Sequence, residues 1–136
     1  MDYVALLAAI RRAFPASALE PLTAEQIVSI REQQPDVPRS YLDFLQTVGA
    51  GRIGEMSFAL YNGLCEPAEF FDQVTAEELT GVLLLGDDFG GWHAGFDTRA
   101  GWRIIGVSSA VPVPVPERVG SVGEFVARWV SERNPV

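Results

Sequence analysis

The 136-residue chain contains no lysine, one cysteine, one histidine and no long apolar run. A single cysteine, Cys65, excludes an internal disulfide and a cysteine-based zinc cluster. A single histidine, His93, excludes the paired-histidine patterns of many metal and catalytic sites. No apolar run approaches the roughly 20 residues that a membrane-spanning helix needs. We therefore expect no metal, no cofactor and no membrane partner.

Positive charge is also scarce, because 18 acidic residues outnumber 10 basic ones and the formal net charge is −8. Nucleic-acid binding needs a basic face for the phosphates, so we do not expect it. An acidic surface instead speeds the encounter with a basic partner, although the same charge could serve solubility alone. The first 14 residues lack the basic leader of a signal peptide, and a cytoplasmic location is expected.

The length and an apolar content of 48% predict one globular domain over residues 1–136. Apolar residues recur at helical spacing over residues 2–14, 23–34 and 38–48. A capping box at 23–26 supports the second helix, and Gly49 ends the third. Another capping box at 121–124 opens a closing helix through Val130.

Strand-like runs follow the first three helices, at residues 56–61, 82–85, 92–97 and 102–107. Asn62-Gly63 predicts a tight turn, and short helical turns are expected over 67–72 and 75–78. The three prolines of 111–116 remove ladder donors, so this stretch is either an extended edge or a surface crossing. Together these signals predict an α+β fold with N-terminal helices, a mostly antiparallel sheet of about 4–6 strands and a C-terminal helix on one face.

The stretch Gly86–Asp97, GDDFGGWHAGFD, lies between two of these strands and combines glycine, carboxylate and aromatic residues. Such a patch is better suited to contacting a partner than to filling a core. We expect Trp92 to be partly exposed and His93 to face solvent or a partner, and we interpret the aspartates as turn formers and partner contacts. The predicted partner-binding residues are Tyr61, Asp87, Asp88, Trp92, His93 and Asp97.

Other motifs in the chain favour structural roles. Residues 49–54, GAGRIG, match G-x-G-x-x-G but follow a predicted helix instead of a strand, so a helix stop and entry into a strand is favoured over a nucleotide site. His93 with nearby carboxylates would make a weak hard-cation site at best. Asp87 and Asp88 would point to opposite faces of a strand, which disfavours a shared acid–base role. No catalytic residue is predicted.

Three motifs in order resemble the SUKH superfamily, which includes the SMI/KNR cell-wall-assembly regulator domain. VPRSYLDFLQTVGAG at 37–51 is similar to that family's helix and glycine stop. LLLGDDFGGWHAGFD at 83–97 is similar to its strand–turn–strand, and SVGEFVARWV at 121–130 is similar to its closing helix. The chain departs from the pattern in its glycine turn, FGGWH, and in its VPVPVP run.

The resemblance implies an α+β domain that acts by binding, frequently as a bacterial immunity protein. Such a protein neutralises a polymorphic toxin, often a nuclease, and needs no active site. A basic toxin domain is thus the expected partner of this acidic chain, which we expect to be a monomer or a weak dimer. The alternatives are a regulatory scaffold that binds host proteins and an enzyme or small-ligand-binding domain that uses a cleft around His93 and Asp97.

Overall fold

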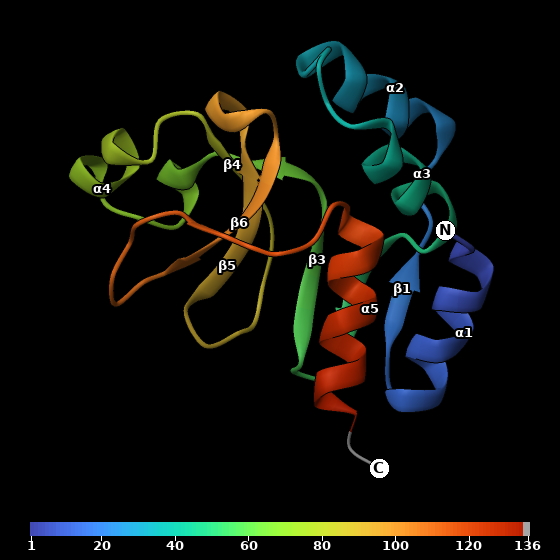
Figure 1. The fold of residues 1–136 in the computed structure, drawn as a ribbon. Coiled ribbons are helices and arrows are strands. Elements are labelled where there is room, and N and C mark those ends of the chain that lie inside the picture. The colour runs from blue at the N-terminus through green and yellow to red at the C-terminus, as the bar shows by residue number, and fades with distance from the viewer. Residues whose placement is uncertain (135–136) are drawn as a thin grey trace.

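The computed structural model describes residues 1–134, which form an α+β fold (Figure 1). The α-helices are α1 (Tyr3–Ala13), α2 (Ala24–Gln33), α3 (Arg39–Thr47), α4 (Gln73–Glu78) and α5 (Val122–Arg133). The strands are β1 (Ala18–Glu20), β2 (Ala50–Ile53), β3 (Phe58–Cys65), β4 (Val82–Asp87), β5 (Trp92–Asp97), β6 (Arg103–Ser108) and β7 (Val115–Pro116). Two short 3-10 turns, η1 (Pro67–Glu69) and η2 (Thr98–Ala100), precede α4 and β6.

The strands form one antiparallel sheet whose spatial order follows the chain from β1 to β7. Seven strands exceed the predicted 4–6, because β1, β2 and β7 are only three, four and two residues long. Runs this short carry no alternation of apolar and polar residues that a sequence pattern could detect. Their pairing depends on neighbours that are distant in sequence.

Local capping signals place the starts of α2 and α5 where the sequence predicts them. Thr23 and Gln26 form the reciprocal capping box of α2. Ser121 caps α5 by accepting a hydrogen bond from the Glu124 amide, but Glu124 in turn accepts from the amide of Gly120 and not from Ser121. The return hydrogen bond of the α5 capping box therefore comes from the residue before the N-cap, not from the N-cap itself.

The turn predicted at Asn62-Gly63 is wrong, because β3 continues through this pair to Cys65. The pairing of β3 with β4 changes register between Leu60 and Cys65, so the pair lies in an irregularity of the strand. The chain reverses only after residues 66–81. The proline-rich stretch adopts the extended-edge alternative, since Val115 and Pro116 pair with β6 at the border of the sheet.

The two faces of the sheet are covered very differently (Figure 1). We call the side packed by α1, α3 and α5 the helix face; its core contains Phe44, Phe58, Phe96 and Val126. The opposite side, the thin face, has a small core of Leu79, Val82, Leu84, Ile105 and Val107. The segment that contains η1 and α4 packs on it, through Phe71 and Leu79.

Within residues 1–134, no helix combines the length and the apolar character needed to cross a membrane.

Candidate functional site

The loop between β4 and β5 is built by its own aspartates. The Asp87 carboxylate accepts a hydrogen bond from the Phe89 amide at 2.8 Å. The Asp88 carboxylate accepts from the amides of Gly90 and Trp92 at 2.8 and 3.0 Å. These side-chain-to-backbone bonds hold the left-handed residue Phe89, at φ 63°, in the loop. The interpretation of these two aspartates as turn formers is confirmed.

Tyr61, Asp87 and His93 come together on the thin face. The Tyr61 hydroxyl donates a hydrogen bond to Asp87, and Asp87 lies opposite His93 in the β4–β5 pairing. Phe70 stacks on Tyr61 with ring centroids 5.4 Å apart and lies 4.9 Å from the His93 ring. The Phe71 ring also contacts His93, with ring centroids 5.3 Å apart. The structure thus joins three of the predicted residues in one aromatic cluster.

The expectation that His93 faces solvent or a partner is wrong. Its side chain is only 7% exposed, and its Nδ1 atom is buried without a hydrogen-bond partner among the described residues. Trp92 and His93 alternate across the strand, so when Trp92 packs toward α5, His93 must point into the thin face. The fold of η1 then places Phe70 and Phe71 over the imidazole.

Burial sets the protonation of this cluster. It lowers the pKa of His93, against the opposing effect of the Asp87 and Asp88 carboxylates. Burial, and then the hydrogen bond to Asp87, raise the pKa of Tyr61. Burial and the nearby Glu69 carboxylate raise the pKa of Cys65 to about 11. Near neutral pH the imidazole is therefore uncharged and the thiol protonated, which makes Cys65 a poor nucleophile.

The remaining predicted residues lie elsewhere. Trp92 is half-buried and packs on the helix face against Phe125 and Trp129. Asp97 caps the turn after β5 by accepting from the Arg99 amide at 3.0 Å. It lies four positions further along the extended strand than His93, a rise of about 13 Å. With Asp88 in the β4–β5 loop, the six predicted residues lie in four places, and His93 and Asp97 are near opposite ends of β5.

The glycines of the G-x-G-x-x-G match are explained by strand packing. A Cβ atom on Gly49 would lie 2.1 Å from the carbonyl oxygen of Glu20, and one on Gly51 would lie 2.0 Å from that of Ala18. Both carbonyls belong to β1, which runs beside β2. Glycine is required here because the two backbones approach each other closely. The preferred interpretation, a helix stop followed by a strand, is confirmed.

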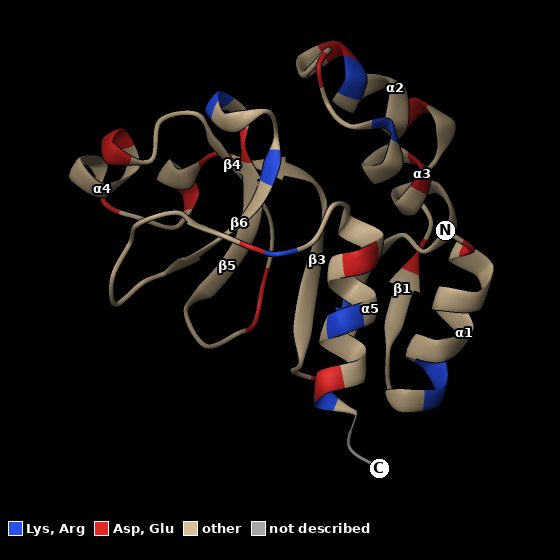
Figure 2. Cartoon of the chain, in the orientation of Figure 1, with Lys and Arg blue, Asp and Glu red and all other residues tan. Residues whose placement is uncertain are grey.

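An acidic segment that no sequence motif indicates lies next to the Tyr61 cluster. No arginine occurs between Arg52 and Arg99, whereas nine acidic residues do. Five of the nine are exposed on the segment that covers the thin face, which carries acidic but no basic residues in Figure 2. We call residues 66–78 the acidic segment; its carboxylates are Glu66, Glu69, Asp72, Glu77 and Glu78.

The acidic segment also exposes apolar side chains. Phe70 is 43% exposed and Val74 is 68% exposed. The ion pairs found within residues 1–134 lie on α5, so none of the five carboxylates is paired with an arginine of the described chain. The charge run itself was the available signal in the sequence. No signal in the sequence indicates the exposure of Phe70, because this exposure depends on how η1 lies on β3 and β5.

Comparison of the chain with protein-family models, with curated proteins and with solved structures gives no match. Among residues 1–134, no group of three or more His, Cys, Asp or Glu side chains is arranged to hold a metal ion. The candidate site is therefore defined by the structure alone. It consists of the acidic segment with Tyr61, Asp87 and His93 beneath it.

Proposed function

We propose that the protein is a non-enzymatic binding domain of the immunity type, which neutralises a basic toxin domain by direct contact. The observation that supports this most strongly is the acidic segment, with five exposed carboxylates, no arginine partner among the described residues and an exposed aromatic ring among them. Unpaired carboxylates on a surface attract a partner of opposite charge and accelerate its association.

Phe70 supplies the apolar part of this surface. Its ring is held at an interplanar angle of 12° on Tyr61, and Tyr61 is fixed by its hydrogen bond to Asp87. A ring fixed before binding loses little conformational entropy in a complex, so it can contribute more to affinity. Phe70 is therefore the proposed anchor, because Trp92, which the sequence also predicts to bind the partner, lies on the other side of the sheet.

A nuclease toxin suits this surface, because a nuclease must present a basic face to phosphates. The acidic segment would occupy that face and exclude nucleic acid from it. A regulatory scaffold could use the same surface on a host protein, and the two functions differ in whether the chain rescues cells from a toxin. A toxin encoded immediately upstream of this chain is the partner to test first.

The experiment uses charge reversals matched for net charge. The test variant carries Glu77→Lys and Glu78→Lys, and the control carries Glu32→Lys and Asp36→Lys on the exposed surface in and after α2. At low salt the test variant should associate with the toxin domain about tenfold more slowly or slower still, because opposite charges on the two partners steer their encounter. The control should associate nearly as fast as the natural chain. The natural chain and the control should also rescue toxin-expressing cells, whereas the test variant should rescue them poorly.

Phe70→Ala tests the anchor by a different readout. Loss of a central aromatic contact acts mainly on dissociation, so the dissociation rate constant should rise by about tenfold or more. Val28, which is 41% exposed on α2, provides a matched apolar control as Val28→Ala. Equal effects of the test and control variants in both pairs would place the interface elsewhere and overturn the proposal.

A further inference from the structure

A cleft of about 570 Å³ lies on the other side of the sheet, between α5 and the residues that follow β7. Its apolar floor consists of Trp92, Phe125 and Trp129. The Trp92 ring is nearly parallel to the other two, at 17° to Trp129 and 22° to Phe125, with centroids 5.8 and 6.0 Å apart. This volume is within the range of small-molecule sites.

The floor of the cleft is rigid. A Cβ atom on Gly106 would lie 2.3 Å from Cζ2 of Trp92, so the indole rests directly on the backbone of β6. Phe125 and Trp129 are 6% and 7% exposed, and the Trp129 indole N–H donates to the Ser57 hydroxyl at 3.1 Å. Half-buried Trp92 is left as the ring that a ligand can cover.

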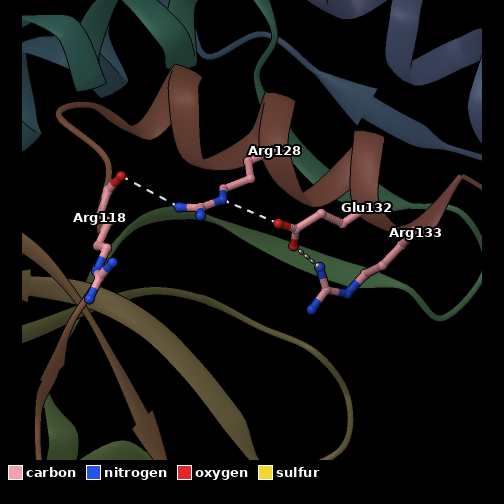
Figure 3. Close-up of polar contacts among 4 residues, drawn as sticks. All are labelled: Arg118, Arg128, Glu132 and Arg133. Atoms are coloured by element: carbon pink, nitrogen blue, oxygen red, sulfur yellow. Dashed lines mark hydrogen bonds and ion pairs between the residues drawn. The ribbon is translucent and has the colours of Figure 1, made fainter.

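Three of the ten arginines line this cleft (Figure 3). Arg128 and Arg133 both pair with Glu132, at 3.2 and 3.4 Å, and the Arg133 guanidinium lies 3.4 Å above the Trp129 ring. Arg118 comes from the residues after β7, and its guanidinium points away from Arg128. Within residues 1–134 this guanidinium has no hydrogen bond or ion pair, although its backbone carbonyl accepts from Arg128.

The cleft is richer in free donors than in free acceptors. Asp88, Glu117 and Glu132 also line it, so the formal charges balance. However, one Asp88 oxygen accepts from two backbone amides and both Glu132 oxygens are paired with arginines. Among the described residues, this leaves the Glu117 carboxylate and the second Asp88 oxygen as the free acceptors, fewer than the free N–H groups of the three guanidinium groups. Each guanidinium carries five N–H donors. A ligand that brings acceptors can therefore bind donors that have no partner within the described protein.

We propose that this cleft binds a small aromatic anion, with its ring against Trp92 and its acid group on the Arg118 guanidinium. A planar ring extends the existing parallel stack, and a guanidinium matches the two oxygens of a carboxylate or a phosphate. The site lies on the helix face, opposite the acidic segment, so it does not depend on the proposed toxin partner.

The test follows the three indole N–H signals of the full chain in ¹⁵N–¹H NMR spectra, with naphthalene-2-carboxylate and 1-naphthyl phosphate as probes. Saturable shifts are expected for Trp92 and Trp129. The Trp102 signal should stay in place, because that ring packs on Phe96 instead of the cleft. The probe that binds more tightly identifies the acid group, and neutral 2-naphthamide should bind at least about tenfold more weakly.

Arg118→Gln should weaken binding of the tighter probe by about tenfold, because one charge-assisted contact is lost. Arg11→Gln, which changes an exposed arginine of α1, is the control and should leave the dissociation constant unchanged. Arg118 has no side-chain partner among the described residues, so its replacement should not disturb folding. Equal binding of the neutral amide, an unchanged constant in Arg118→Gln, or shifts confined to Trp102 would overturn the proposal.

Discussion

The helix face and the thin face of the sheet differ in how much they contribute to stability. The core of the helix face joins 24 buried residues from the helices and strands, whereas that of the thin face contains five. Most of the hydrophobic stabilisation therefore comes from one side, since it scales with the apolar area buried. The other side can then carry a segment of like charges and an exposed phenylalanine, which add little to stability. Stability and the candidate binding surface occupy opposite faces.

The largest expected difference between the faces is in the cost of removing an aromatic ring. Phe58 is fully buried on the helix face against Phe125 and Trp129, so Phe58→Ala should lower the free energy of unfolding by about 3–5 kcal/mol. Phe71 on the thin face is only half-buried, so Phe71→Ala should lower the free energy of unfolding by only about 1–2 kcal/mol. Urea unfolding measures both, and equal losses would contradict the division described above.

The contact between Trp92 and Gly106 offers a second test on the helix face. Gly106→Ala adds a methyl group that would lie against the indole, and overpacking of this kind costs about 1–3 kcal/mol. Gly90→Ala is the control, because a Cβ there meets nothing closer than 3.4 Å, and its effect should stay within about 0.5 kcal/mol. Trp92→Ala should make the Gly106→Ala change nearly neutral, whereas additive losses would show that the two residues do not touch.

The buried imidazole of the thin face should make stability depend on pH. Burial lowers the pKa of His93 below its ordinary 6.5, so the unfolded chain binds a proton first as the pH falls. His93 thus contributes a stabilisation that is complete above pH 6.5 and is lost as the pH falls from 6.5 through the folded-state pKa. The difference in unfolding free energy between the natural chain and His93→Asn should therefore shrink as the pH falls below 6.5. A difference that stays constant with pH would show that His93 titrates alike in the folded and unfolded chains.

The smallest effect is expected from the exposed ion pairs of α5. Glu132 pairs with Arg128 and Arg133, but these side chains are 44–56% exposed. Glu132→Gln should lower the unfolding free energy by no more than about 0.5 kcal/mol. The difference should disappear in 1 M salt, where the screening length is about 3 Å. A larger or salt-resistant loss would mean that the exposed ion pairs of α5, and not only its buried side chains, contribute substantially to the free energy of unfolding.

The sequence predicts the helices well because their signals are local. Thr23 and Ser121 form caps with residues three positions away, and the stripe of α3 repeats within nine residues. The short strands are missed for the opposite reason. β1 pairs with β2 across a gap filled by two helices, and nothing within its three residues indicates this pairing.

The candidate site was predicted in part. The sequence places Asp87, Asp88, Trp92 and His93 near one another, and this is correct along the chain. Strand alternation then sends Trp92 and His93 to opposite faces, which is why one predicted patch becomes two surfaces. Phe70 could not be predicted, because its contacts with Tyr61 and His93 arise only when η1 folds over the sheet.

The edge strand β7 has a further consequence. In residues 111–116 every second position is a proline, and the valines between them are 55–66% exposed. An apolar strip along the border of a sheet would ordinarily invite another molecule to add its own strand and start aggregation. Prolines offer no amide hydrogen to such an incoming strand, so lateral growth of the sheet stops at this border.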